Sequence, residues 1–201
     1  MKISLQNAGK RYNRDWIFRN LSYEFSAPGA YAITGLNGSG KSTLLQCIAG
    51  SVLHSEGKFI YTVEGKITET PHLYLSIATP YMELVEEMTG TEMLEFHRKF
   101  KSLTESNESI LSVVALENAA TKQIRYFSSG MKQRLKLALA FFSQSPILLL
   151  DEPVSNLDKE GIKLYHSLIK NYASEKLVIV SSNDEQEYDF CKHIIHISDY
   201  K

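Results

Sequence analysis

Cysteine is scarce in this chain, in which Cys47 and Cys191 are the only two among 201 residues. They form no CxxC pair and no spacing typical of metal ligands, so the sequence predicts two inert thiols, as a reducing cytosol permits, and no disulfide framework or metal cluster. Long apolar runs are missing too. The longest aliphatic stretch, PILLLDEP, is far below the roughly 18 residues of a spanning helix, and the N-terminus lacks the apolar segment of a signal peptide. We expect this chain neither to be secreted nor to cross a membrane by itself.

An excess of charge is missing as well. Lys and Arg total 22 against 23 Asp and Glu, which gives a formal net charge of −1. Such a chain has no overall positive field that would draw it onto nucleic acid or anionic lipid, so we expect no nucleic-acid partner. The length suits one domain, or one core with a modest inserted subdomain.

Hydrophobic periodicity divides the chain into three parts. The first 34 residues predict a β-rich sheet, in which LSYEF places Leu21, Tyr23 and Phe25 on one face. Residues 89–144 predict helices, because TGTEMLEFHRKF, NESILSVVAL and SGMKQRLKLALAFFSQ carry apolar residues at three-to-four spacing. From ILLLDE onward, strands alternate with helices, which is typical of a parallel sheet with crossover helices.

Shorter segments between these parts complete the pattern. STLLQCIAG predicts a helix that stops at Gly50, and GKFIYTVEG and HLYLSIA predict strands. EQEYDFCKH predicts a helix and IIHIS a strand near the C-terminus. The histidines show no metal spacing and are expected to be structural: His54, His72, His97, His166, His193 and His196.

A glycine-rich loop follows the buried run AYAIT. Its sequence, GLNGSGKST, fits G-x-x-x-x-G-K-[ST] and lies between a predicted strand and a predicted helix, which is the context that the motif requires. Backbone N–H groups turned inward by glycines, the helix N-terminus and the lysine together hold phosphates, so the motif predicts a nucleoside triphosphate site. The residues expected to form this site are consecutive: Gly35, Leu36, Asn37, Gly38, Ser39, Gly40, Lys41, Ser42 and Thr43.

A nucleotide in such a loop is bound together with a metal ion, and that ion needs a carboxylate ligand from elsewhere in the chain. The Ser42 hydroxyl is one expected Mg²⁺ ligand, and Asp151, at the end of the buried strand ILLLDE, is the other. Glu152 comes next, where a carboxylate can orient and deprotonate an attacking water. The pattern therefore favours hydrolysis over transfer to a bound acceptor.

Read in order, these stretches resemble the ATP-binding cassette (ABC) ATPases, the nucleotide-binding subunits of ABC transporters, over nearly the whole chain. GLNGSGKSTLL is similar to their P-loop, FSSGMKQR to their signature motif, ILLLDEP to Walker B, and SNLD to the D-loop. The fold we expect is α/β: a P-loop NTPase with a RecA-like core, an N-terminal antiparallel β portion and an inserted α-helical subdomain. It forms a single domain over residues 1–201, with the core at 1–79 and 146–201 and the helical subdomain at about 80–145.

The resemblance also implies roles for particular residues. Tyr12, ahead of the P-loop, matches the aromatic residue that stacks on adenine in this family. Ser128 and Gly130 match the pair that contacts the γ-phosphate held by a second cassette, and Asp158 matches the residue that bridges the two halves. ATP, Mg²⁺ and ATP-dependent pairing, with itself or with another cassette, follow from the resemblance.

Three departures from the family pattern bear on activity. The signature reads SSGM where SGGQ is commonest, although Ser128 and Gly130 are kept, and its GMKQR ending resembles exporter-type cassettes. No glutamine occurs between Gln46 and Gln123, where the family has one, and Thr79 and Glu83 are both candidates to reach the metal or the water instead.

The third departure is Asn183, which stands where the family usually has a histidine that contacts the γ-phosphate. Asparagine donates hydrogen bonds but cannot become cationic or shuttle a proton. With Glu152 and Asn183 as the catalytic residues, we therefore predict slow hydrolysis.

Three functions compete at this point. The first is an ATPase subunit that drives a membrane permease from the cytoplasmic face of the cell membrane, with Tyr81, Met82 and Leu84 either contacting a permease helix or packing in the core. The second is a soluble, non-transport ABC ATPase acting as an ATP-gated regulator, although such proteins usually carry tandem cassettes or a long coiled coil. A P-loop GTPase or small-molecule kinase is third, and the lack of an N-K-x-D motif favours adenine over guanine.

Overall fold

An antiparallel sheet begins the chain, as the N-terminal pattern predicts. Alternation along β2 buries Leu21 and Phe25 and leaves Tyr23 half-buried, because side chains two apart share a face. β5 was not foreseen, since three mostly exposed residues carry little pattern. In spatial order the four strands are β2 (Asp15–Ser26), β1 (Lys2–Tyr12), β4 (Glu56–Val63) and β5 (Lys66–Thr68).

The second sheet is the predicted parallel one. Every residue of β7 and β8 is buried, as expected for strands with both faces covered. β3 pairs in parallel with β8 and β9, and β8 with β7. In order, the strands are β6 (Leu75–Ala78), β7 (Ile147–Asp151), β8 (Leu177–Ser181), β3 (Gly29–Thr34) and β9 (His193–His196).

The helix after the glycine loop also forms where the sequence places it. α1 spans Lys41–Ala49 and contacts β7 and β8. It ends at Gly50, whose φ of 76° lies in the left-handed region that favours glycine, and whose N–H bonds back to the carbonyls of Cys47 and Gln46.

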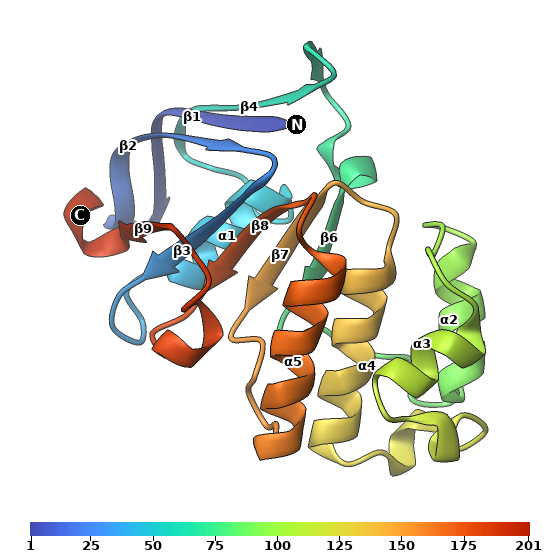
Figure 1. Cartoon of the computed structure of the whole chain (residues 1–201). Coiled ribbons are helices and arrows are strands. Elements are labelled where there is room, and N and C mark those ends of the chain that lie inside the picture. Colours follow the sequence, from blue (N-terminus) through green and yellow to red (C-terminus); the bar gives the residue numbers. More distant parts are fainter. The chain divides into compact units, whose positions relative to one another are not determined.

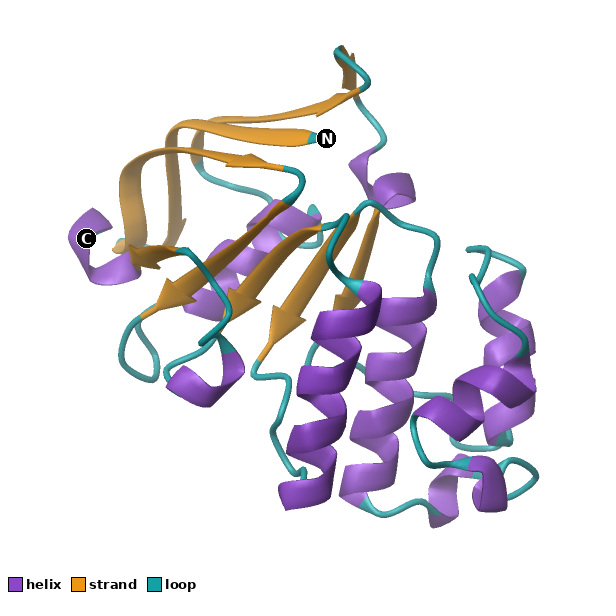
Figure 2. Cartoon of the chain, viewed as in Figure 1, coloured by secondary structure: helices purple, strands orange, loops and turns teal.

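Four further α-helices follow, shown in purple in Figure 2. Each begins at a side chain that accepts a backbone N–H, namely Thr89, Ser106, Ser128 and Asp158. α4 and α5 lie side by side (Figure 1), with Phe141 edge-on to Tyr165. The helices are α2 (Gly90–Arg98), α3 (Asn107–Val113), α4 (Ser129–Phe142) and α5 (Lys159–Tyr172).

The computed structural model describes residues 1–201, which divide into two compact units. The first unit contains residues 1–77, 146–151 and 175–201, and the second contains 78–145 and 152–174. The second unit therefore includes α5, which packs on α4, whereas the sequence placed this helix with the core at 146–201. The division into a core and a subdomain at about 80–145 stays a prediction.

Two local expectations are wrong. HLYLSIA starts with a 3-10 turn over Pro71–Tyr74, so its strand begins only at Leu75. EQEYDFCKH forms a single 3-10 turn at Glu185–Glu187, because only Glu187 within that turn is buried and the segment lacks the apolar spacing of a packed helix. The α/β fold itself is confirmed, and no helix is both long and apolar enough to span a bilayer.

Candidate functional site

The glycine loop curls tightly between β3 and α1. Gly38 and Gly40 have φ angles of 75° and 108°, which side chains with a Cβ rarely adopt. A Cβ at Gly40 would also lie 2.3 Å from Cγ2 of Ile17. The loop conformation thus depends on glycine at these positions.

Lys41 lies within this curl. Its side chain is buried, and Nζ donates hydrogen bonds to the carbonyl oxygens of Gly35, at 2.9 Å, and Leu36, at 3.3 Å. A buried ammonium group held only by neutral carbonyls attracts an anion strongly, because the surroundings screen it poorly.

A hydroxyl and a carboxylate meet beside the loop. Ser42 Oγ donates to Oδ1 of Asp151 at 3.0 Å, which joins the first turn of α1 to the end of β7. Asp151 is 2% exposed. Oxygen ligands of this kind suit Mg²⁺.

Two further hydroxyls near this point are buried without a partner. Ser39 Oγ, in the loop, and Ser181 Oγ, at the end of β8, accept and donate no hydrogen bond within the protein. Ser181 is the register partner of Asp151. Since buried hydroxyls are normally paired, the residues present fit an additional polar group such as a hydrated metal ion with phosphates.

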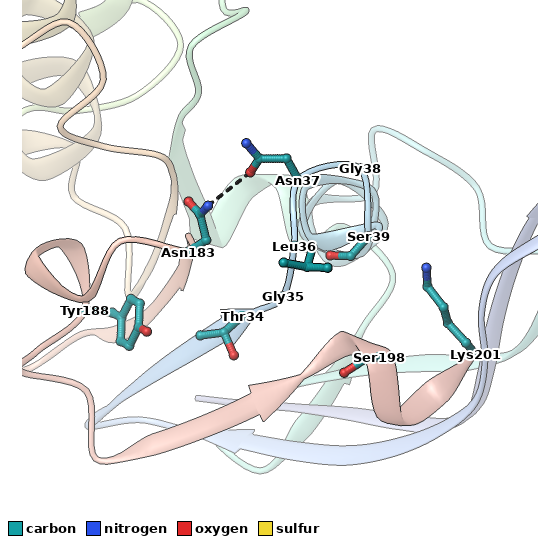
Figure 3. A pocket seen from close by; sticks show the side chains of 10 residues that line it. All are labelled: Thr34, Gly35, Leu36, Asn37, Gly38, Ser39, Asn183, Tyr188, Ser198 and Lys201. Carbon is teal, nitrogen blue, oxygen red and sulfur yellow. Dashed lines mark hydrogen bonds between the residues drawn. The ribbon is translucent and has the colours of Figure 1, made fainter.

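A cavity of about 620 Å³ opens beside the loop. Asn183 reaches the loop there, because its Nδ2 donates to Oδ1 of Asn37 at 3.2 Å (Figure 3). The structure thereby brings Asn183 together with the predicted loop residues. The cavity is lined by Thr34, Gly35, Leu36, Asn37, Gly38, Ser39, Asn183, Tyr188, Ser198 and Lys201.

Tyr188, Ser198 and Lys201 were not predicted as lining residues. They come from the segments that follow β8 and β9, on the carboxyl side of parallel strands. Ligands bind in α/β proteins at that edge of the sheet, so this rule could have found them.

Tyr12 ends β1 with 46% of its surface exposed. Its ring is in contact with Lys10, whose Nζ lies 4.6 Å from the ring centroid. The tyrosine is thus available to a planar ligand from solvent.

The signature residues begin α4. Ser128 Oγ accepts the N–H of Met131 at 3.2 Å, and Gly130 lies in the first turn. A Cβ at Gly130 would approach the carbonyl oxygen of Asn156 to 3.1 Å, closer than is usual. Backbone N–H groups and a hydroxyl at a helix start are suited to an anion.

Asp158 begins α5 in the same unit. Its Oδ1 accepts the Gly161 N–H at 2.8 Å and the Arg134 Nη2 at 3.2 Å. These contacts, that of Gly161 foremost, hold the pKa of Asp158 below its usual range. The side chain is therefore charged at neutral pH.

Glu152 follows the metal-ligand candidate Asp151 with a left-handed backbone, φ 43°. Its carbonyl oxygen accepts the Ser155 N–H at 3.1 Å, which closes a turn. Such a conformation is uncommon for a residue with a Cβ and is frequent at functional sites.

The segment 79–88, which occupies the place of the missing glutamine, is fastened mainly through its backbone. Lys136 Nζ donates to the carbonyls of Thr79 and Pro80, and Ile124 N donates to Met88 O. Lys132 pairs with Glu86. Thr79 and Glu83 both stay candidates for the role of the glutamine.

Side chains of this segment differ in exposure. Tyr81 is 85% exposed, Met82 is half-buried, and Leu84 is buried. Leu84 therefore belongs to the packing of the second unit and is not available to a partner, whereas Tyr81 is. The segment lines a cavity of about 650 Å³ together with Lys132 and Lys136.

Two histidines hydrogen-bond to hydroxyl groups within the protein, and both cysteines are free. His97 Nε2 lies 2.8 Å from Ser143 Oγ, and His196 Nδ1 lies 2.7 Å from Thr34 Oγ1. Burial raises the pKa of Cys47 to about 11 and that of Cys191 to about 12, so both thiols are protonated at neutral pH.

Comparison with known proteins agrees with this geometry. Residues 18–155 match the family described as ABC transporter. The chain is 30% identical to the uncharacterized ABC transporter ATP-binding protein YybJ of Bacillus subtilis (strain 168), over 94% of this chain and 89% of that protein. It is 29% identical to the lantibiotic transport ATP-binding protein SrtF of Streptococcus pyogenes, over 98% and 84%.

Solved structures share the fold. A putative ABC transporter ATP-binding protein from Pyrococcus furiosus has a TM-score of 0.85 at 19% identity, over 100% of both chains. The dimeric structure of MJ0796, a bacterial ABC transporter cassette, has a TM-score of 0.83 at 22% identity, over 97% of this chain and 94% of that one. The chain therefore belongs to the ABC transporter family, as one of its ATP-binding subunits with ATPase activity.

Proposed function

We propose that this subunit binds ATP with Mg²⁺ in the glycine loop, pairs with a second cassette when ATP is bound, and drives a membrane permease by slow hydrolysis. The observation that carries the proposal is the meeting of Ser42 and Asp151 at 3.0 Å, next to a loop that holds a buried lysine. This arrangement combines phosphate binding and metal binding in one place.

The nucleotide is held at both ends. Tyr12 stacks on adenine, and the residues from Leu36 to Thr43 hold the phosphates through backbone N–H groups and Lys41. Ser42 and Asp151 would hold Mg²⁺, which would supply positive charge to offset that of the phosphates.

Hydrolysis uses two residues that follow strands β7 and β8. Glu152 accepts a proton from water as the water oxygen bonds to the γ-phosphorus, and the bond to the bridging oxygen breaks with its electron pair on ADP. Asn183 donates a hydrogen bond toward the γ-phosphate. Because its neutral amide cannot carry positive charge, the transition state is stabilised less than by a histidine, and turnover is slow.

A second cassette completes each site. Ser128 and Gly130 contact the γ-phosphate bound by the partner, and Asp158 lies at the junction between the two cassettes. The start of α4 supports this role, because a hydroxyl and free N–H groups favour an anion there. Pairing with a copy of itself would give two equal sites.

The permease partner places the subunit on the inner face of the cell membrane, in the cytoplasm. Tyr81 and Met82 offer it apolar contact, and the exposure of Tyr81 supports this role. Relatives named for lantibiotic transport and for cytochrome c biogenesis export favour an exporter.

The test is ATP hydrolysis by the purified protein with Mg²⁺, together with size exclusion with and without ATP, on the wild type and Glu152→Gln. We expect slow turnover in the wild type, at least a hundredfold less in the variant, and an ATP-dependent dimer that is most stable in the variant. An unchanged rate in Glu152→Gln would remove this residue from the mechanism. Failure of the wild type to bind ATP would overturn the proposal.

A further inference from the structure

Lys10 is the cation that contacts Tyr12. Its Nζ lies 4.6 Å from the ring centroid, within the range of a cation–π interaction. The two residues are separated by one position in β1. The other cation–ring contacts, those of Arg11 and Arg19, are made with Trp16.

The ammonium group of Lys10 is itself held in place. Nζ donates to the carbonyl oxygen of Leu53 at 2.8 Å, across 43 residues of sequence. That acceptor is fixed, because Ser55 N donates to Gly9 O at 2.7 Å and Arg11 N donates to Ser55 Oγ at 3.1 Å. The segment after α1 is thus bound to β1 on both sides of Lys10.

Lys10 also interacts electrostatically with α1, the helix that starts at Lys41. Its charge acts on Cys47 in the last turn of that helix, where it partly offsets the rise in the thiol pKa. A cation near a helix C-terminus is favourable, because the helix dipole is negative there.

One face of the Tyr12 ring is therefore occupied, while 46% of the residue remains open to solvent. We propose that Lys10 is a positioning residue for the adenine base, which holds the ring of Tyr12 so that its open face receives the base. The inference rests on the proposed stacking of adenine on Tyr12. A ring that is already fixed loses less side-chain freedom when the base binds, which raises affinity.

The test separates the base from the phosphates. Lys10→Met keeps most of the length of the side chain but removes its charge and its hydrogen bond to Leu53. We expect the Kd for ATP to rise about three- to tenfold by titration calorimetry. The Kd for inorganic tripolyphosphate should stay unchanged, because it has no base to stack.

Two controls accompany it. Lys58→Met removes an exposed lysine from β4 of the same sheet and should change neither Kd. In a Tyr12→Ala background, Lys10→Met should have no further effect on ATP binding, since the ring that it positions is gone. Thermal unfolding of each variant verifies the fold.

The contrary results are distinct. If Tyr12→Ala weakens ATP binding and Lys10→Met does not, Lys10 has no positioning role. An equal loss for ATP and tripolyphosphate would mean that Lys10 acts on the phosphates, which overturns the inference. A wild type that binds neither ligand would overturn the proposed function, and this inference with it.

Discussion

Asn183 donates a hydrogen bond to the side chain of Asn37, which ties the segment after β8 to the glycine loop (Figure 3). Both groups are neutral amides. The contact holds Asn183 at the loop but supplies no positive charge. The residue is therefore positioned for the phosphates without the electrostatic stabilisation that a cation would add.

Asn183→His should therefore accelerate hydrolysis. An imidazole can still donate to Asn37 and can also become cationic, so we expect kcat to rise roughly ten- to a hundredfold while KM for ATP changes less than about threefold. Steady-state kinetics measure both. Asn171→His, on the exposed side of α5, is the matched control. An unaltered kcat in Asn183→His would mean that Asn183 does not limit the reaction.

Asp151→Asn tests the metal site. The amide oxygen can still accept from Ser42, so the fold should persist, but the loss of negative charge should raise the Mn²⁺ concentration needed for ATP binding at least tenfold. Calorimetric titration of Mn²⁺ with ATP present gives the value. Asp199→Asn, an exposed change near the C-terminus, should have no effect. Equal metal dependence in both variants would exclude Asp151 as a ligand.

Ser128→Ala and Ser106→Ala form a matched pair, because both serines begin a helix and accept a backbone N–H. Each substitution should lower the free energy of unfolding by about 1 kcal/mol, or Tm by roughly 2 to 4 °C. Only Ser128→Ala should also abolish the ATP-dependent dimer of the Glu152→Gln protein. Size exclusion decides this, and loss of the dimer in both variants would assign the effect to helix capping alone.

Lys176→Met should stabilise the protein at neutral pH. Burial lowers the pKa of Lys176 to about 8, so below that pH its charge opposes folding. As the pH rises from about 8 toward the usual lysine value near 10.4, the folded chain loses its proton first and the penalty disappears. We expect the free energy of unfolding of Lys176→Met to exceed that of the wild type by about 1 to 3 kcal/mol at pH 7. This difference should shrink as the pH rises through the window.

Urea unfolding at several pH values measures the difference between variant and wild type. Lys170→Met, on the exposed face of α5, is the control and should show no such pH dependence. A gain in Lys176→Met that stayed constant across the window would contradict a role for the charge.

Local signals made much of the fold predictable. Buried runs predicted β3, β7 and β8, three-to-four spacing predicted α2, α3 and α4, and the alternation of strands with helices predicted α5. The glycine loop was predictable because its conformation depends on residues such as Gly38 and Gly40. The C-terminal turn at Glu185–Glu187 was not, because packing and not propensity decides whether such a short segment continues as a helix.

Long-range contacts escaped prediction for a different reason. Lys10 and Leu53 meet across 43 residues, and nothing in the local pattern of either residue indicates its partner. Asn183 and Asn37 meet across 146 residues, and only the resemblance to a known family, not the local pattern, places both at the phosphates. Tyr188 and Ser198 line the cavity beside the loop because the strands before them are parallel, so the rule for ligand sites in α/β sheets could have indicated them although their local pattern does not.

The backbone bonds of the segment 79–88 bear on how this subunit can evolve. Lys136 donates hydrogen bonds to main-chain carbonyls of this segment. The carbonyl oxygens of Met88 and Glu86 accept the N–H groups of Ile124 and Arg125, respectively. Main-chain bonds of this kind survive most substitutions of the residues that make them, and the side chain of Tyr81 is almost wholly exposed. Substitutions can therefore change the exposed side chains of this segment, while its main-chain linkage to the helix that begins at Ser129 and to the turn before it is kept.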